Sequence, residues 1–389
     1  MSPFENFPDT GLALTPPMHF HHLTGGLALL VGSNRLAMLL SPGGAELSLF
    51  SIPHGSSILS TFEKHCDLRV LGRNNIDHAS ELHDPIMSHF ITSIQGSNRA
   101  CAANTQRDHW EGLATALSRL GRGYDARLAS RLASQIHLSL SRIERLSISY
   151  RTTLSYVVRS NSPSETSFNS DKYSHYISCE FRSCLNELYS LRDAALAAMF
   201  RIKFGDTGSF KLGKLKALVL SSDSDSAHLV SQSMFNTSGD LLIDEMSLYR
   251  NVAQHCLGAT NPAFCDAYRL QISRGPFGEL PHILFPLYDN MDAMRSVERS
   301  SSKGSLWTLS QNETERFMGL SQYRDALEFC FDCLARLLRI VEAMAVEIQI
   351  APEMVTITDD DIIEATITRN GKTEKYRRDE KTGKLALVS

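Results

Sequence analysis

Apolar residues recur at spacings of three and four over several long parts of the chain, which is the pattern of amphipathic helices. The widest apolar stripe lies within residues 322–350 and is broad enough to be buried against other helices. Gly205 and Gly258 follow two of the patterned segments, where glycine commonly caps a helix C-terminus. The pattern predicts helices over residues 108–158 (two, broken near 121–123), 173–204, 211–220, 227–235, 241–257 and 322–350.

The two ends of the chain follow a different pattern. Within residues 1–60, short apolar runs separated by Gly and Pro fit short strands or buried turns. These runs span residues 27–31, 36–40 and 47–50. After residue 354, β-branched residues alternate with polar ones, and Asn370-Gly371 is typical of a hairpin turn. We therefore expect a small antiparallel β-hairpin appendage at the C-terminus.

The pattern as a whole predicts a mainly α protein in three parts. The Ser-rich polar stretch at residues 160–167 is the clearest candidate for a linker. It separates a mixed α/β N-terminal region, residues 1–160 and helical from about residue 108, from a helical bundle. The bundle is expected over residues 172–350, and the β appendage over residues 351–389.

Two further expectations concern the end of the bundle. Residues 263–319 contain Gly275-Pro276, Leu280-Pro281 and a Ser-rich patch, so they are expected to be loop-like. The helix at 322–350 is expected to pack on the helix at 173–204 as the closing element of the bundle.

Composition narrows the classes of function. With 389 residues and a net charge of −4, the chain has no global basic field, so any contact with RNA must be local. Its eight cysteines are scattered, several in apolar helical contexts, as reduced buried thiols are. The N-terminus has no basic signal region, and residues 26–40 are too short and interrupted to span a membrane. These features predict a cytoplasmic protein with no membrane partner.

The candidate chemistry lies near the end of the helix at 241–257. Arg250, Asn251 and His255 place a permanent cation, an amide and a titratable imidazole within six residues. On a helix, Asn251 and His255 lie roughly 40° apart around the axis, whereas Arg250 lies roughly 140° from His255. His255 can act as a general acid or base, and Arg250 can neutralise a developing phosphorane. Such a set suits metal-free RNA cleavage, with Arg250 reaching round the helix or serving a site on a second chain.

The spacing alone is weak evidence. A bare Arg-x4-His is expected about once by chance in a chain of this composition. The pattern Arg-Asn-x3-His also occurs at Arg73 and His78, in no clear helix, whereas the later copy lies in the penultimate helix of the expected bundle. Cations near a helix C-terminus are favourable through the helix dipole alone, so a purely structural role for Arg250 and His255 stays open.

The order of the expected helices resembles the HEPN family of helical bundles. A long amphipathic helix, two shorter ones, a helix ending in Arg-Asn-x3-His, a loop and a long closing helix resemble that family over residues 172–350. The family motif is Arg, four to six residues and His, commonly with a polar residue after the Arg; Arg250, Asn251 and His255 match it. The segment at 263–319 is longer than in compact members. The resemblance implies a metal-independent endoribonuclease with a composite active site at a homodimer interface.

The resemblance also implies the partners of the chain. Arg250, Asn251 and His255 are then the catalytic residues, RNA is the substrate, and neither a cofactor nor a metal is needed. Relatives of this type act in toxin–antitoxin, antiphage and RNA-processing systems, which makes an antitoxin or regulatory protein a candidate partner. A second hypothesis keeps the bundle without the chemistry, as a dimeric sensor or scaffold that binds a ligand, nucleotide or partner protein. A third places catalysis in the N-terminal region, through Arg73 and His78.

Three other features are expected to be structural. Cys330 and Cys333 form a lone CxxC inside an apolar stripe, which favours buried thiols over zinc ligands. The histidines beside Pro16-Pro17 have no carboxylate or Cys to complete a metal site, so an exposed loop is expected there. They are His19, His21 and His22. The basic residues of the C-terminal appendage predict a charged sheet edge that prevents edge-to-edge pairing.

Overall fold

The computed structural model of the chain describes residues 18–34, 36–40, 46–51, 68–76, 93–95, 100–159, 168–235, 242–255, 267–275, 278–288, 290–301, 324–353, 364–369, 372–378 and 385–387. Helices predominate among these residues, and antiparallel sheets account for the rest of the regular structure. The expectation of a mainly α fold is therefore confirmed.

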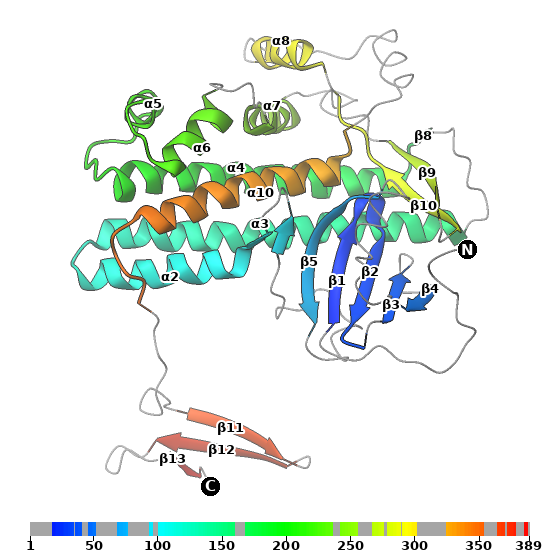
Figure 1. The fold of residues 1–389 in the computed structure, drawn as a ribbon, viewed down its shortest axis with the longest axis horizontal. Helices are drawn as coiled ribbons and strands as arrows, with labels where there is room; N and C mark the ends of the chain where they lie inside the picture. The colour runs from blue at the N-terminus through cyan, green and yellow to red at the C-terminus, as the bar shows by residue number, and fades with distance from the viewer. Residues whose placement is uncertain are drawn as a thin grey trace.

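Two long helices are the central elements of the fold. Helices α3 (Gly123–Arg159) and α4 (Lys172–Ala198) lie side by side and antiparallel (Figure 1). Arg201, in the π-helical turn Met199–Lys203 that continues α4, pairs with Asp125 at the start of α3 at 2.7 Å. Helix α2 (Ala103–Arg119) packs along α3 and ends just before Gly121, so the expected pair of helices, with its break, is confirmed.

The other helices pack against this pair and against one another. Helix α10 (Ala326–Glu347) crosses α4 and closes the bundle, as expected for residues 322–350 (Figure 1). Three shorter helices lie beyond α4, on the side away from α2 (Figure 1). These are α5 (Leu212–Leu220), α6 (Asp225–Met234) and α7 (Leu242–His255), close to the ranges expected from periodicity.

The expectation of a loop over residues 263–319 is wrong in part. Strands β9 (Tyr268–Gly275) and β10 (Gly278–Leu284) form a hairpin, with the short β8 (Phe168–Asn169) beside β9, and α8 (Met291–Ser301) follows and packs on α7. Pro281 argued against a strand here, because proline has no backbone N–H to donate. In the described sheet, however, β10 lies at the edge and pairs with β9 alone, and an edge strand tolerates a missing N–H. Because α8 follows α7, the helix with the motif is not the penultimate one.

The N-terminal region forms a seven-stranded antiparallel sheet in the order β4-β3-β2-β1-β5-β6-β7. Its strands are β1 (Met18–Leu23), β2 (Ala28–Gly32), β3 (Leu36–Leu40), β4 (Glu46–Ser51), β5 (Val70–Ile76), β6 (Ser93–Gln95) and β7 (Ala100–Ala102). Strands β2, β3 and β4 confirm the three apolar runs as strands. The sheet contacts α10 through β5, β6 and β7. It also contacts the helices through β1, where Phe20 lies 5.3 Å from the Arg151 guanidinium of α3 and His22 lies 5.8 Å from the Phe331 ring of α10.

Buried apolar residues form one cluster that runs from Leu23 in β1 to Ala345 in α10. It includes residues on both sides of the Ser-rich stretch, such as Leu154 of α3 and Ile177 of α4. Helix α3, assigned above to the N-terminal region, therefore shares its core with the bundle. The division of the chain at residue 160 stays a prediction.

A tight turn, η1 (Thr24–Gly26), connects β1 to β2 and packs against α3 and β10. Gly25 and Gly26 have positive φ angles of 67° and 84°, which glycine adopts without strain. A Cβ on Gly25 would lie 2.4 Å from the Cβ of His282 in β10, and one on Gly26 would lie 2.9 Å from the Cβ of Tyr150 in α3. Both positions therefore require glycine, because the turn lies directly against two other elements.

The C-terminal β appendage is confirmed as an antiparallel sheet of three strands. They are β11 (Glu364–Arg369), β12 (Lys372–Arg378) and β13 (Leu385–Leu387), and Figure 1 shows them set apart from the helices. Arg369 pairs with Lys372 across the expected Asn370-Gly371 turn, which itself lies outside the described residues. The side chains of the strands also lie outside them, so the charged sheet edge stays a prediction.

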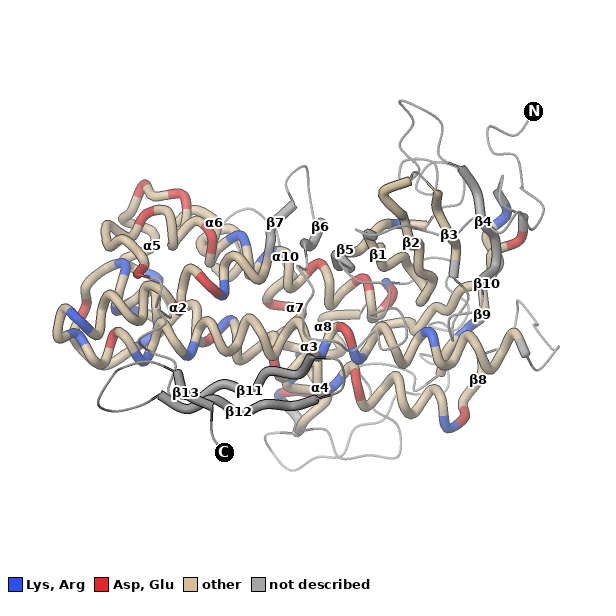
Figure 2. The backbone as a smooth tube through the Cα atoms, turned by 90° about the horizontal axis from the view of Figure 1, so that it is seen from below, with Lys and Arg blue, Asp and Glu red and all other residues tan. Residues whose placement is uncertain are grey.

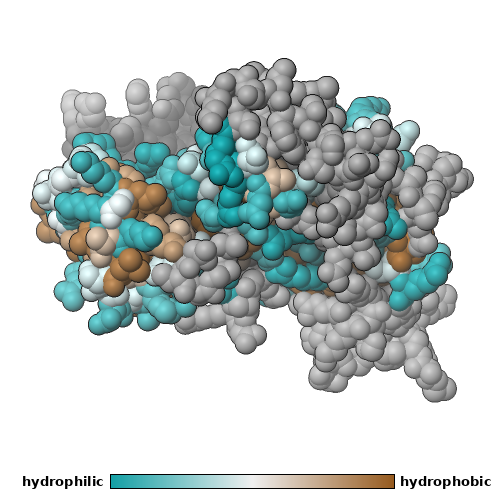
Figure 3. Space-filling view, turned by 90° about the horizontal axis from the view of Figure 1, so that it is seen from above, coloured by the Kyte–Doolittle hydropathy of each residue, from teal (hydrophilic) through white to brown (hydrophobic). Residues whose placement is uncertain are grey.

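The surface has no single dominant charge. Figure 2 shows basic and acidic residues intermixed along the described helices, as the small net charge suggests. Apolar side chains gather over α5 and α6 (Figure 3), where Phe210, Leu212 and Leu220 are 47%, 53% and 55% exposed. Within the described ranges, every helix is too short or too polar to cross a membrane.

A buried carboxyl group on α3 predicts a pH-dependent stability. Burial raises the pKa of Glu144 from 4.5 to about 7, although the Arg151 charge opposes this. The folded state thus holds a proton that the unfolded state has released between these pH values, so this group's contribution to stability falls as pH rises through that window. We expect Glu144→Gln to gain about 2 kcal/mol relative to wild type between pH 5 and pH 8, measured by urea unfolding. An equal difference between the two proteins at both pH values would contradict this.

Candidate functional site

Helix α7 carries the motif and is held by four residues that recur every third position. They are Ile243, Met246, Tyr249 and Val252, all almost fully buried. The hydroxyl of Tyr249 donates to the Tyr288 carbonyl at 2.6 Å, and its ring lies edge-on to Phe329 of α10 at 5.2 Å. The helix is therefore fixed along one side, and Arg250 and Asn251 follow directly after Tyr249.

Arg250 lies over an aromatic ring of the neighbouring helix. Its guanidinium carbon is 4.4 Å from the centre of the Tyr189 ring on α4, and its Nη1 donates to Asn251 Oδ1 at 3.0 Å. Its Nε is buried and has no hydrogen-bonding partner. The side chain is thus positioned by stacking and one amide, while part of its donor capacity is unused.

Tyr189 belongs to a polar seam between the antiparallel helices α4 and α7. The seam has three steps along the two helices: Gln254 donates to Asn186, Arg250 lies over Tyr189, and Arg192 donates to Ser247 at 2.6 Å. The guanidinium of Arg192 also lies 3.8 Å from the Tyr189 ring. The seam therefore offers amides and two guanidinium groups side by side on one helix pair.

The charge of Arg250 is not neutralised by a carboxylate within the described part of the chain. The other arginines around α7 differ: Arg192 pairs with Asp193 at 2.7 Å and Arg295 of α8 with Asp244 at 3.2 Å. Arg324 likewise pairs with Glu245. A partly buried guanidinium with an unpaired Nε is suited to receive an anion, and phosphate is one of the oxyanions that arginine binds in planar, bidentate geometry.

Asn251 points toward a different helix. Its Nδ2 donates to Glu298 Oε1 of α8 at 2.6 Å. Arg250 and Asn251 are hydrogen-bonded to each other but contact α4 and α8 respectively, as neighbouring positions on a helix do. Helix α8, in the segment that was expected to be loop, thus covers one side of the motif.

His255 is the last residue of α7. Its side chain lies outside the described residues, so the expectation that it shares a face with Asn251 stays a prediction. The earlier copy of the motif differs in context: Arg73 lies on strand β5, and His78 lies outside the described residues. The structure therefore places only the later copy on a helix.

The structure also describes the cysteine pair and the N-terminal histidines that were expected to be structural. Cys330 and Cys333 are fully buried, and burial raises the pKa of both thiols, which confirms them as buried thiols. The exposed loop expected at His19, His21 and His22 is wrong, because the apolar Phe20 and Leu23 between and after them make this a strand, β1. His21 and His22 are buried. In the described ranges, no three potential ligands from His, Cys, Asp and Glu group as a metal site.

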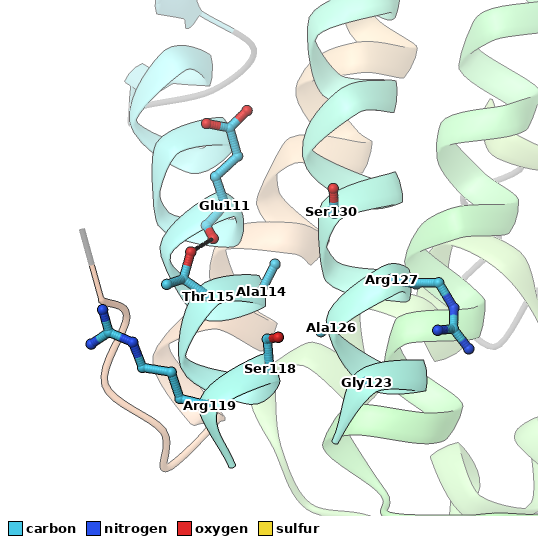
Figure 4. Close-up of a pocket in the computed structure, with 9 residues that line it drawn as sticks. All are labelled: Glu111, Ala114, Thr115, Ser118, Arg119, Gly123, Ala126, Arg127 and Ser130. Atoms are coloured by element: carbon cyan, nitrogen blue, oxygen red, sulfur yellow. Dashed lines mark hydrogen bonds between the residues drawn. The ribbon is translucent and has the colours of Figure 1, made fainter. Parts of the chain in front are cut away.

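A shallow groove lies between α2 and α3, away from α7. Small residues such as Ala114, Gly123 and Ala126 line it, and Figure 4 shows Arg119 and Arg127 at its margin pointing in different directions. Because the two guanidinium groups do not converge, the groove has no site geometry comparable to the seam.

Sequence reasoning missed the partners of the motif. Asn186, Tyr189 and Arg192 recur every third residue on α4, which places polar groups along one side of the helix. This periodicity was a usable signal. Glu298 had none, because the helix that carries it was not expected.

No protein-family model matches the chain, and no curated protein or solved structure shows significant similarity to it.

Proposed function

We propose that the chain is a metal-independent endoribonuclease of the HEPN type, with Arg250, Asn251 and His255 as its catalytic residues. One observation carries the proposal: Arg250 holds a partly buried positive charge beside Tyr189, without a carboxylate partner in the described part of the chain. A guanidinium charge without a carboxylate partner favours binding of an anion, and RNA cleavage by these three residues requires that anion to be an RNA phosphate. Toxin–antitoxin or antiphage defence is the setting this activity suggests, with an antitoxin or regulatory protein as partner.

The reaction needs a base, an acid and a stabiliser of negative charge. The 2′-hydroxyl of the substrate gives its proton to a base and its oxygen attacks the adjacent phosphorus, while the bond to the 5′-oxygen breaks and that oxygen takes up a proton. His255 serves as base or acid, because imidazole exchanges protons near neutral pH. Arg250 stabilises the phosphorane, and Asn251 orients one of these groups. The products are a 2′,3′-cyclic phosphate and a 5′-hydroxyl.

We propose that two chains form the site. Arg250 lies roughly 140° around the helix from His255, and its side chain is directed to α4 rather than along α7. A second chain can bring its own His255 to this arginine, which a closed homodimer does at two symmetric positions.

The direct test is RNA cleavage by purified protein in EDTA. We expect the wild type to cut a labelled RNA and His255→Ala to lose at least about 100-fold in rate, since the base or acid is removed. His228→Ala, an exposed histidine on α6, is the matched control and should cut at the wild-type rate. An inactive wild type, or His255→Ala that cuts as fast as wild type, would overturn the proposal.

A specific observation favours a second candidate, a dimeric sensor or scaffold without catalysis. Both motif side chains that the structure describes are engaged within the chain, Asn251 with Glu298 and Arg250 with Tyr189. Expression in a bacterial host separates the candidates: a ribonuclease slows growth and Arg250→Ala relieves it, whereas for a scaffold neither protein affects growth.

A further inference from the structure

Three basic side chains share one face of the N-terminal sheet, apart from the motif on α7. His19 and His21 are two residues apart on β1, so they project from the same face, with ring centres 6.2 Å apart. Arg73 on β5 is the residue directly opposite His21 in the antiparallel register, which places its side chain on that same face. The pairing of β1 with β5 therefore brings two imidazoles and a guanidinium together.

Two nitrogen atoms in this group are buried without a hydrogen-bonding partner. They are Nδ1 of His21 and Nε of Arg73. The His21 residue is only 5% exposed, so water from bulk solvent does not satisfy its ring. Leaving such a group unpaired costs stability, and a cluster of two at one place indicates a ligand that supplies the acceptor.

The electrostatics of His19, His21 and Arg73 also favour a ligand that supplies an acceptor. Burial, together with the neighbouring positive charges of His19 and Arg73, lowers the pKa of His21 from 6.5 to about 4. No ion pair joins Arg73 to a carboxylate in the described part of the chain. The opposite face of β1 differs, since His22 packs there on Phe20 and Phe331. On the His21 face, the charges of His19 and Arg73 lie beside the buried Nδ1 of His21 and the buried Nε of Arg73.

We propose that His21 and Arg73, with His19 beside them, form a binding site for a phosphate group. Arg73 supplies a planar set of donors that fits two oxygens of an oxyanion, and the imidazoles supply donors from the adjacent strand. A tetrahedral phosphate has oxygens for all three side chains, whereas a carboxylate has only two. The bound phosphate belongs either to free inorganic phosphate or to a phosphate monoester such as a nucleotide.

Thermal unfolding of the full-length protein, followed by its helical circular dichroism, tests the site. Inorganic phosphate is expected to raise the melting temperature in a saturable way, whereas chloride and acetate at equal ionic strength are not. Arg73→Met should weaken phosphate binding about tenfold or more, since hydrogen bonds to a charged partner are lost. Adenosine 5′-monophosphate is the second probe: tighter binding than phosphate identifies a monoester as the ligand, and weaker binding identifies free phosphate.

Two controls keep the test decisive. Arg131→Met removes the same charge from an exposed position on α3 and should leave the phosphate effect unchanged. His21→Asn tests the site a second way if Arg73→Met folds poorly, and it should weaken phosphate binding while retaining the wild-type helical spectrum. A melting temperature that phosphate raises no more than chloride does, or equal phosphate binding by wild type and both site variants, would overturn the proposal.

Discussion

Arg250→Ala is expected to lower the rate of RNA cleavage by about 10²- to 10³-fold, the loss seen when one preorganised group that stabilises transition-state charge is removed. The reason is the uncompensated charge of this side chain. It has the Tyr189 ring and Asn251 as neighbours, and no carboxylate in the described part of the chain holds it. Folding should change little, because an exposed or half-buried cation–π contact contributes only about 1 kcal/mol. Cleavage of labelled RNA and urea unfolding measure the two effects separately.

Arg192→Ala is the matched control, because Arg192 contacts the same tyrosine ring and carries the same charge. Its guanidinium is already paired with Asp193, so its loss should alter cleavage only a few-fold. Equal losses in the two variants would show a general RNA-binding surface and contradict a catalytic role for Arg250. Unchanged cleavage by Arg250→Ala would contradict it outright.

Asp325→Ala is expected to cost about 3 to 5 kcal/mol of unfolding free energy, the range for removing one partner of a buried charged network. Asp325 caps α10: one carboxylate oxygen accepts from the Tyr150 hydroxyl of α3 and the Phe285 backbone N–H, both at 2.8 Å. The other accepts from the Leu327 N–H at 3.0 Å. Alanine would remove the acceptor that these buried donors share, and with it the link from α10 to α3 and to the end of β10.

Asp332→Ala provides the comparison on the same helix. Asp332 pairs with Arg69, but both side chains are about a third exposed or more, and such pairs contribute about 0 to 1 kcal/mol. Urea unfolding of the two variants should therefore differ by several kcal/mol. Similar losses in both would contradict the assignment of Asp325 as the junction of α3, α10 and β10.

The long helices were predictable, unlike α8, because each of them buries a long, regular apolar stripe. The apolar residues of α10 and α4 recur at helical spacing over many turns, so the period is clear from the sequence alone. Strand β1 was not, since His19, His21 and His22 are polar residues in a buried strand, and only the pairing with β2 and β5 makes the strand stable. The β9–β10 hairpin was hidden by Pro281, whose position at a sheet edge cannot be seen in the sequence.

The candidate site, like the fold, was predictable from the sequence only in part. The sequence alone located Arg250 and Asn251, because their spacing and helix are local properties. Arg250 contacts Tyr189 on α4, which is 61 residues away in the chain. Asn251 contacts Glu298 on α8, which is 47 residues away. Such contacts depend on tertiary packing, which no local pattern encodes.

Mixing two inactive variants tests the two-chain site most directly. Co-expressed Arg250→Ala and His255→Ala chains form mixed dimers in which one of the two sites retains both the arginine and the histidine. If each site combines Arg250 of one chain with His255 of the other, the mixture should recover about a quarter of the wild-type cleavage rate, since about half of the dimers are mixed. A mixture as inactive as either variant alone would contradict a site shared between two chains.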